Sequence, residues 1–507
     1  MQEQEPQQGS AGVIPYALGQ EMRVGVIDVG SNSVRLVVFE GAARSPAYFF
    51  NEKVLCGLGK DMADSGVLNP EGRARAHETL NRFAALAKAM EVQSLNGVAT
   101  AAVRDAEDGP DFVAQVEAET GITLQVASGP EEGRLSAQGV LLGWPDAEGI
   151  VCDIGGSSLE LAELSGGEIG RCETSALGPL KLQQFEKAKD RAAYIEKTLK
   201  KLHKKFPGKP DRMFLVGGSF RAIARVDMER NGYPLKVLHE YRMTPEQAAE
   251  TAEWCAGQDA DGLGELGTDT SAARLQLVPL AAEVLARIVK EFSPAELAIS
   301  SYGIREGMLY EALPKQLRSR DPLIEACLHM EAASARFPGA GDALYLWMQP
   351  LFRDEPKEVL RLIHAASLLH DINWRSHPDY RAETCFETAT RANLGGLAHD
   401  ERIFLGLALL HRYKNSRKHV DDEFVAGVVD EQMRQKAERV GRALRLGAML
   451  AGGSAAALSD TELTLEKSRL TLHLGPQAKR FFGETVTKRA SALADSLGAE
   501  AEITQAS

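Results

Sequence analysis

The sequence predicts an α/β protein with a duplicated lobe, followed by a mostly helical C-terminal region. Three observations support this fold class. A strand–turn–strand pattern occurs twice, at residues 22–40 and 149–164. Strand and helix patterns then alternate as far as residue 313, whereas residues 320–450 carry almost only helical patterns.

The repeated unit is the most informative feature. Its two copies read MRVGVIDVGSNSVRLVVFE and GIVCDIGGSSLELAEL, each an apolar run, then D-[V/I]-G-x-x-S, then an alternating run. Alternation with a period of two indicates strands, and glycine between such runs indicates a hairpin. Each copy is therefore expected to place an Asp at the end of one strand and a Ser at the start of the next. Two such hairpins, far apart in the chain, predict a duplicated α/β lobe.

The remaining elements follow from period, caps and turn residues. Helices are predicted over 69–90, where Asn69 is a plausible cap and Pro70 the first helical residue, and over 109–120, 130–143 and 181–205. Strands are predicted at the start of 94–106, over 122–128, and at the start of 212–226 and 295–313, where a helix follows each. Two short strands, 461–466 and 469–474, precede a last helix. The chain is therefore expected to comprise a tail (1–21), lobe I (22–140), lobe II (141–314) and a helical domain (315–507). A polar, basic linker near 314–320 marks the boundary between lobe II and the helical domain.

Composition narrows the class of protein. The chain has 507 residues, 44% of them hydrophobic and 25% charged, as in ordinary multidomain globular proteins. Its six cysteines are scattered singly, which favours reduced thiols over a zinc ribbon or a disulfide framework. A net charge of −13 argues against broad nucleic-acid or membrane binding, although a local basic channel could still bind an anion. No apolar stretch suits a membrane span and the N-terminus does not resemble a signal peptide, so a cytoplasmic location is expected.

Both hairpin turns could bind phosphate. A phosphate site needs approachable backbone N–H groups, a metal that neutralises charge, and a group that positions water. Carboxylates at the end of the first strand in each copy would point at Mg²⁺. In a single loop of this kind, Asp and Ser more often bond their own backbone, but the recurrence between strands favours function. The candidate residues are Asp28, Gly30, Ser31, Asn32 and Ser33 in one loop, and Asp153, Gly155, Gly156, Ser157 and Ser158 in the other.

Four other segments carry candidates with two interpretations each. Glu131 and Glu132 either complement a helix dipole or position a water for attack. Arg104 forms either a surface ion pair or a bidentate phosphate clamp. The turn Gly217-Gly218-Ser219 either holds an anion at a helix N-terminus or only allows tight packing. Arg305-Glu306-Gly307, before an amphipathic helix, is equally ambiguous.

Together these segments resemble the Ppx/GppA phosphatase family, which comprises exopolyphosphatases and guanosine pentaphosphate phosphohydrolases. The resemblance covers residues 22–313 and is looser beyond residue 320. Its motifs, in chain order, are IDVGSNSVRLVVFE, GLGKDMADSGVLNPEGRARA, VATAAVRDAEDGPDF, SGPEEGRLSAQGV, VCDIGGSSLELAEL, SALGPLKL and YGIREGMLYE.

The resemblance implies two actin-like, ribonuclease-H-like lobes of the acetate and sugar kinase, heat-shock protein and actin (ASKHA) class, with the active site between them. It also implies a Mg²⁺-dependent, processive hydrolase, with K⁺ as a further cation and a homodimer as the assembly. By this resemblance the catalytic glutamate is Glu132 and the phosphate-binding arginine is Arg104. Asp28, Asp153 and Glu132 are then the expected metal ligands. The second loop reads GGSS where the family usually has GGGS, which narrows the backbone conformations available to that turn.

The C-terminal region resembles the helical HD-type domain of longer family members. His370-Asp371 matches the HD pair, but residues 339–347 lack the upstream histidine that a metal site requires. A buried, hydrogen-bonded His–Asp pair is therefore expected in place of a metal site. The basic segment HRYKNSRK (411–418) is either a solvated helix end or a wall of a polyanion channel, with Arg412, Lys414, Arg417 and Lys418 as the candidate ligands.

The leading prediction is therefore an exopolyphosphatase acting on inorganic polyphosphate. Hydrolysis of pppGpp to ppGpp by the same site is the alternative, and sequence hardly separates the two substrates. An actin-like kinase or ATPase also has paired D-x-G loops, but it lacks the VATAAVR and EEGR segments. A non-catalytic sensor of polyphosphate or (p)ppGpp is disfavoured by the intact Glu132, Asp28 and Asp153.

Overall fold

The computed structural model describes residues 23–40, 44–267, 270–415 and 422–505. The predicted tail at residues 1–21 therefore lies outside the described residues. The described chain forms two compact units. The first comprises residues up to Asp227 and Arg242–Arg320, and the second comprises Met228–Tyr241 and the residues from Asp321 onward.

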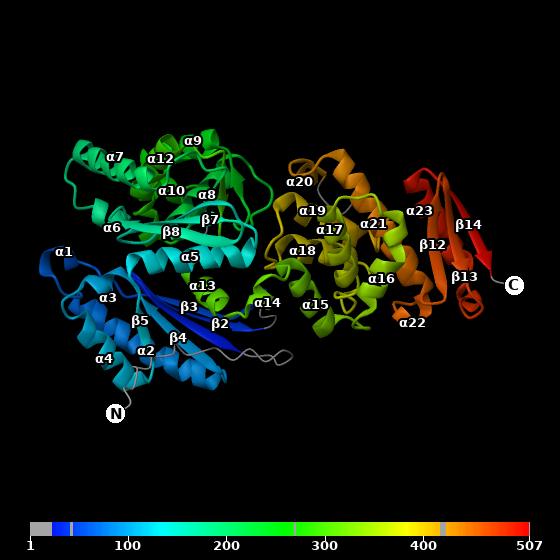
Figure 1. The fold of residues 1–507 in the computed structure, drawn as a ribbon, viewed down its shortest axis with the longest axis horizontal. Coiled ribbons are helices and arrows are strands. Elements are labelled where there is room, and N and C mark those ends of the chain that lie inside the picture. The colour runs from blue at the N-terminus through cyan, green and yellow to red at the C-terminus, as the bar shows by residue number, and fades with distance from the viewer. Residues whose placement is uncertain (1–22, 41–43, 268–269, 416–421, 506–507) are drawn as a thin grey trace, which may run out of the picture. The chain divides into compact units, whose positions relative to one another are not determined.

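The first unit contains a five-stranded sheet near its N-terminus (Figure 1). The strands lie in the order β3-β2-β1-β4-β5, with β1–β2 and β2–β3 antiparallel and β1–β4 and β4–β5 parallel. Asn69 caps α2 as predicted, because its side chain accepts a hydrogen bond from the Gly72 N–H at 2.9 Å. The elements are β1 (Val24–Val29), β2 (Ser33–Glu40), β3 (Ala47–Leu55), α1 (Met62–Ser65), α2 (Pro70–Ala89), β4 (Ser94–Ala99), α3 (Ala101–Asp105), α4 (Gly109–Thr120) and β5 (Leu124–Val126).

A second sheet repeats this arrangement. Its strands lie in the order β10-β11-β9-β6-β7-β8, so that β8-β7-β6-β9-β11 has the order and the strand directions of β3-β2-β1-β4-β5. The predicted fold class, a duplicated actin-like α/β lobe with a helical C-terminal region, is confirmed. The strands are β6 (Gly149–Ile154), β7 (Leu159–Ser165), β8 (Glu168–Ser175), β9 (Arg212–Val216), β10 (Arg242–Met243) and β11 (Glu296–Ile299).

Helices complete this part of the first unit. The helix predicted over 181–205 is two helices, α6 and α7, and the segment between them is anchored by Phe185, whose ring lies 5.1 Å from that of Tyr194. The helices are α6 (Pro179–Leu182), α7 (Ala188–Lys205), α8 (Gly218–Arg230), α9 (Pro245–Ala256), α10 (Ala260–Gly264), α11 (Ala272–Leu275) and α12 (Val278–Phe292).

Two helices, α5 (Gly129–Gly143) and α13 (Ile304–Ala312), join the sheets. The apolar face of α5 packs on the second sheet, and Leu309 of α13 packs on Val24, Val26 and Val37 of the first. The helices touch backbone to backbone. A Cβ on Gly307 would lie 1.8 Å from the carbonyl oxygen of Leu135, and one on Gly139 would lie 2.3 Å from that of Gly303. Only glycine fits at these two positions.

The first unit extends past the predicted linker. The segment near 314–320 contains α14 (Lys315–Arg318) and is held by the fully buried Arg44, whose Nε donates to the carbonyls of Arg318 at 3.2 Å and Arg320 at 3.0 Å. The division between units therefore follows Arg320, whereas the sequence suggested residue 314. The polar composition of the segment concealed these contacts.

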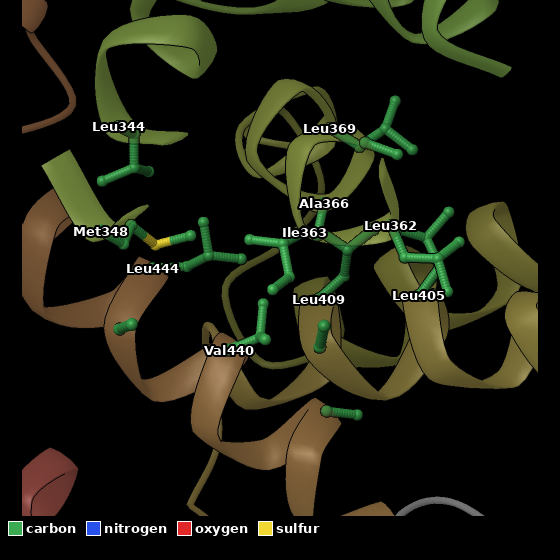
Figure 2. Close-up of a cluster of buried hydrophobic side chains, with 14 of the residues drawn as sticks. Leu344, Met348, Leu362, Ile363, Ala366, Leu369, Leu405, Leu409, Val440 and Leu444 are labelled. Carbon is green, nitrogen blue, oxygen red and sulfur yellow. The ribbon is translucent and has the colours of Figure 1, made fainter. Parts of the chain in front are cut away.

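The second unit is mainly helical, around one hydrophobic core. Leu344, Met348, Leu362, Ile363, Leu405, Leu409, Val440 and Leu444 meet at its centre (Figure 2). They come from α16, α17, α19 and α21, and every residue of α19 from Arg402 to His411 is buried. The helices are α15 (Pro322–Ser334), α16 (Ala340–Met348), the short 3₁₀ helix η1 (Gln349–Leu351), α17 (Lys357–Leu369), α18 (Arg381–Arg391), α19 (His399–His411), α20 (Asp422–Ala426), α21 (Glu431–Leu450) and α22 (Ala455–Leu458).

A small sheet ends the second unit. The two predicted strands form the antiparallel pair β12 (Thr461–Glu466) and β13 (Arg469–Leu474). After η2 (Ala478–Phe481), α23 (Glu484–Leu497) crosses back so that β14 (Glu500–Gln505), which the sequence analysis missed, pairs parallel to β13. Among the described residues, no helix is long and apolar enough to cross a membrane.

Candidate active site

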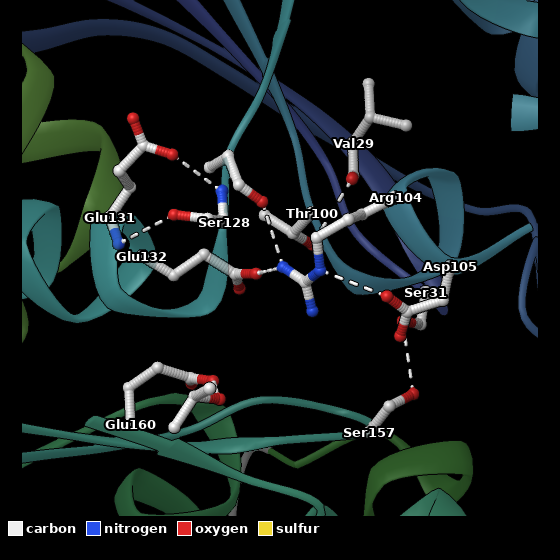
Figure 3. Close-up of polar contacts among 12 residues, drawn as sticks. Val29, Ser31, Thr100, Arg104, Asp105, Ser128, Glu131, Glu132, Ser157 and Glu160 are labelled. Atoms are coloured by element: carbon white, nitrogen blue, oxygen red, sulfur yellow. Dashed lines mark hydrogen bonds and ion pairs between the residues drawn. The ribbon is translucent and has the colours of Figure 1, made fainter. Parts of the chain in front are cut away.

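The two glycine-containing turns meet in the first unit. Gly30 N–H donates to the Ser33 carbonyl at 3.0 Å, and Gly155 N–H donates to that of Ser158 at 3.0 Å, so each turn closes its own hairpin. The turns also contact each other, because Ser157 Oγ donates to Ser31 Oγ at 3.2 Å (Figure 3). One pocket is lined by all ten loop candidates, namely Asp28, Gly30, Ser31, Asn32, Ser33, Asp153, Gly155, Gly156, Ser157 and Ser158. The structure therefore brings these candidates together, while their roles stay predictions.

The third predicted turn opens into the same pocket. Gly217, Gly218 and Ser219 follow β9 and begin α8, and all three line the pocket. Gly217 has a φ of 104°, and a Cβ there would lie 2.4 Å from the Ile154 carbonyl oxygen. Glycine is thus required at this position by both backbone conformation and space.

The two glutamates at the start of α5 make different contacts. Glu131 closes a capping box, because its Oε2 accepts from Ser128 N–H at 2.8 Å while its own N–H donates to Ser128 Oγ at 3.4 Å (Figure 3). Glu132 is 5% exposed and lines the pocket. Glu131 therefore acts at the helix terminus, through a capping box that the sequence analysis did not consider, and of the two glutamates only Glu132 lines a pocket where water could be positioned.

Glu132 forms an ion pair with Arg104 (Figure 3). The same Arg104 Nη1 donates to the Ala127 carbonyl at 2.9 Å, and Nε donates to Asp105 Oδ1 at 3.0 Å. Arg104 is thus held beside Glu132 but is not itself among the residues that line the pocket. Burial raises the pKa of Glu132 to about 7; Arg104 opposes this rise, and the charges of Asp153 and Asp28 add to it.

Sequence analysis missed a further carboxylate, Glu160 on β7. It is 3% exposed, lines the pocket and accepts from Thr174 Oγ1 at 2.8 Å. Burial raises its pKa well above the usual value, and the charges of Glu132 and Asp153 raise it further. The available signal was an acid at the second position of β7, two residues after the second loop.

These carboxylates fit a hard divalent cation. Burial raises the pKa of both Asp28 and Asp153, and Asp153 also accepts a hydrogen bond from Ser136 Oγ. Such buried acids disfavour one another when ionised, and a cation would relieve that cost. No group of three or more Asp, Glu, His or Cys side chains in the described ranges is arranged to hold a metal alone. This donor set suits Mg²⁺, which usually binds one or two carboxylates together with phosphate oxygens and water.

The pocket also contains a set of cations, of which the sequence analysis considered only Arg305 as a candidate. They raise the local positive charge of a chain whose net charge is −13. Burial and the charges of Arg274, Arg35 and Arg221 lower the pKa of Lys53 to about 8. Burial and neighbouring arginines likewise lower the pKa of Arg221 to about 10. These cations repel one another and so favour a polyanion; they are Arg35, Lys53, Arg221, Arg274 and Arg305.

Of the four candidates in the second unit, the structure describes Arg412 and Lys414. Arg412 is 6% exposed and its guanidinium lies 4.5 Å from the Tyr413 ring centre, so it is neither a solvated helix end nor an open channel wall. It is buried because α19 lies in the core of this unit. Lys414 is half-buried, and Arg417 and Lys418 lie outside the described residues.

His370 and Asp371 are both buried and hydrogen-bonded, but each to another partner. His370 Nδ1 bonds the Ser367 carbonyl at 2.7 Å, whereas Asp371 accepts from Arg336 Nε and Nη2, both at 2.7 Å. Burial lowers the pKa of His370 to about 4. The expected His–Asp pair is therefore replaced by an Arg336–Asp371 ion pair.

Comparison with known proteins agrees with this geometry. Residues 37–316 match the model of the Ppx/GppA phosphatase family, and residues 348–504 match a model described as exopolyphosphatase, C-terminal. Exopolyphosphatase 1 of Mycobacterium tuberculosis is 36% identical over 144 residues, which cover 28% of this chain and 42% of that protein. The chain thus spans less than half the length of these curated exopolyphosphatase relatives.

Solved structures match the first part of the fold. An exopolyphosphatase from Cytophaga hutchinsonii aligns with a TM-score of 0.52 and 22% identity, over 59% of this chain and 99% of the other. The Aquifex aeolicus member of the Ppx/GppA family aligns with a TM-score of 0.51 and 22% identity, over 58% and 97%. At this identity the likeness supports the fold alone.

Proposed function

Because this chain belongs to the Ppx/GppA phosphatase family, we propose that it is an exopolyphosphatase. It would hydrolyse the terminal phosphate of inorganic polyphosphate, with Mg²⁺ and a water positioned by Glu132. One observation carries the proposal. A single pocket contains both glycine turns, a buried glutamate with a raised pKa, and five cations.

The proposed reaction assigns a task to each group. Backbone N–H groups and hydroxyls of the two turns bind the oxygens of the terminal phosphate. Glu132 accepts a proton as the water oxygen attacks phosphorus, and the bridging P–O bond breaks to leave orthophosphate and a chain shorter by one unit. A carboxyl with a pKa of about 7 suits a general base near neutral pH. Arg104 holds the carboxylate of Glu132 in place.

The metal has a supporting part. Mg²⁺, when bound, would neutralise charge on the phosphate oxygens. Asp28 and Asp153, one from each turn, would hold it. We expect Mg²⁺ to raise the melting temperature of the wild type, and expect Asp28→Asn to reduce that shift. An equal increase in melting temperature in both proteins would show that Asp28 does not bind the metal.

Phosphate release tests the proposal. The substrates are polyphosphates of graded length, pppGpp and ATP, each with Mg²⁺ and with EDTA. Fastest release from long polyphosphate supports the proposal, whereas fastest release from pppGpp favours the alternative substrate. Tight ATP binding with slow phosphate release would favour a kinase-like ATPase, and binding of polyphosphate without any release would favour a sensor.

A pair of adjacent variants tests the base. Glu132→Gln is expected to lower kcat by roughly 10²–10⁴-fold, the usual contribution of a general base. Glu131→Gln is the matched control, because glutamine also closes a capping box, and it should retain activity. Equal losses in both variants, or none in Glu132→Gln, would refute the assignment. The homodimer and the cytoplasmic location remain predictions, open to sedimentation and fractionation.

A further inference from the structure

Arg305 is a buried arginine that makes no side-chain hydrogen bond or ion pair to the residues that the structure describes. It is the second residue of α13, is 8% exposed, and lines the pocket. Its Nη1 atom is buried and has no hydrogen-bond partner among the residues that the structure describes. No carboxylate within those residues lies close enough to Arg305 to form an ion pair. A buried guanidinium left in this state is costly, so this position calls for an explanation.

Arg44, another buried arginine of the first unit, is an example of an arginine whose role is structural. Arg44 is completely buried, and its Nη1 and Nε atoms donate to backbone carbonyls, including those of Leu142 and Arg320. Arg44 thereby ties the chain together. Arg305 makes no such bonds, so a purely structural role does not account for it.

The adjacent carboxylate is already engaged. Glu306 Oε2 accepts from Gly303 N–H at 2.8 Å, and Glu306 Oε1 accepts from Tyr48 OH at 2.9 Å. These bonds fix the start of α13 and leave Glu306 turned to its own helix and to β3. Arg305 is therefore held firmly, yet its charge is balanced only at a distance, by Glu306, Asp28 and Asp153.

We propose that Arg305 binds the phosphoryl group that is transferred, so that its unpartnered Nη1 atom donates to a phosphate oxygen in the substrate complex. Guanidinium groups match phosphate geometry, and an anion placed between the two turns would supply the missing partner. This inference rests on the proposed function for its substrate and adds a substrate-binding residue to it.

The rigid contact between α5 and α13 supports this role. The glycine contacts at Gly139 and Gly307 join the helix that carries Glu132 to the helix that carries Arg305. The base and the phosphate-binding cation are thereby kept at a fixed spacing. Precise spacing is what in-line attack on phosphorus requires.

A different role is conceivable for the same side chain, namely compensation for the charges of Asp28 and Asp153. The two roles predict opposite effects on the metal. If Arg305 only balances these acids, its removal should tighten Mg²⁺ binding and leave kcat unchanged. If it binds the phosphoryl group, its removal should lower kcat and weaken phosphate binding, without tighter Mg²⁺ binding.

The experiment compares Arg305→Met and Arg305→Lys with Arg134→Met, which removes a surface arginine of α5 paired to Glu311. Thermal unfolding establishes whether each variant folds. If Arg305→Met does not fold, Arg305→Lys, which retains the positive charge, is tested in its place. We expect Arg305→Met to lower kcat by about 10²–10³-fold, as for loss of one charge-stabilising donor, with partial recovery in Arg305→Lys. Arg134→Met should retain wild-type kcat.

A binding measurement separates this inference from the proposed function. Tripolyphosphate is titrated calorimetrically into Glu132→Gln and into Glu132→Gln combined with Arg305→Met. We expect the double variant to bind at least tenfold more weakly. That result would support Arg305 even if the wild type hydrolysed no polyphosphate. Equal affinity, or an unchanged kcat with tighter Mg²⁺ activation, would overturn the inference.

Discussion

Replacing Gly307 by alanine would disturb the contact that joins α13 to α5. The new Cβ would lie 1.8 Å from the Leu135 carbonyl oxygen and 2.7 Å from its carbon, and real Cβ contacts essentially never fall below 3.0 Å. The two backbones would therefore have to separate by at least about 1.2 Å, the difference between 3.0 and 1.8 Å. No flexible side-chain end lies there to move instead.

The magnitude follows from that displacement. Forcing an extra methyl group into a packed contact costs about 1–3 kcal/mol, which corresponds to a melting temperature lower by roughly 2–5 °C for a unit of about 300 residues, at ~2.1 cal/mol/K of unfolding entropy per residue. The displacement also changes the spacing between Glu132 and Arg305. A misplacement of about 1 Å can lower a rate by roughly 100-fold, so we expect kcat to fall by about 10–100-fold.

The assay pairs thermal unfolding with phosphate release from polyphosphate at saturating substrate. Gly264→Ala is the control, because Gly264 is an exposed residue of α10 whose added Cβ would meet only Leu275 Cδ1, at 3.8 Å. That change should be neutral or slightly stabilising, since alanine favours helix over glycine. If Gly307→Ala unfolded and turned over like Gly264→Ala, the argument that this contact sets the spacing of the site would be wrong.

Three further predictions follow from buried acids. If Glu132 is the proposed general base, with a pKa of about 7, kcat/KM should fall about tenfold per pH unit below that value. This decrease at low pH should be absent from the residual activity of Glu132→Gln. Burial raises the pKa of Glu160, so its ionisation costs folding stability increasingly as pH rises above the unfolded value near 4.5. Glu160→Gln should therefore raise the melting temperature at pH 8 and have little effect at pH 4; an equal gain at both would contradict this cause. Asp371→Ala should lower the free energy of unfolding of the second unit by about 2–3 kcal/mol in urea, because it leaves the Arg336 guanidinium without its bidentate partner. Asp379→Ala is the control. It removes an exposed ion pair and should have little effect.

The sequence was sufficient for the duplicated lobe because its signals are local. Alternating apolar residues on both sides of a glycine turn specify each hairpin without reference to the rest of the chain. The helix cap at Asn69 is local in the same sense. By contrast, the choice between Glu131 and Glu132 depends on which side chain turns back to close the cap, and that is a feature of three dimensions.

The cations of the pocket could not be found in this way. Arg35 and Lys53 lie on β2 and β3, Arg221 on α8 and Arg274 on α11, so no single short motif contains all of them. Each is an ordinary charged residue in its own segment. Only the pairing of strands and the packing of helices on the sheets bring them to one place. Arg412 illustrates the opposite error, since a basic run in the sequence suggested exposure and the hydrophobic packing of α19 buried it.

The second unit draws one of its segments from the middle of the chain. Residues 228–241 belong to it, and Tyr233 OH and the His239 carbonyl bond His399 of α19 at 2.8 and 3.1 Å. On the ribosome this segment emerges long before its partners, and at ~5–20 residues per second it waits on the order of ten seconds or more for the rest of the chain. During this time the side chains of Tyr241 and Leu235, which are buried in the folded protein, stay exposed to solvent. A C-terminal fragment starting at Asp321 would lack this segment altogether, so a truncation at that point would remove the two hydrogen bonds that it makes to His399 of α19.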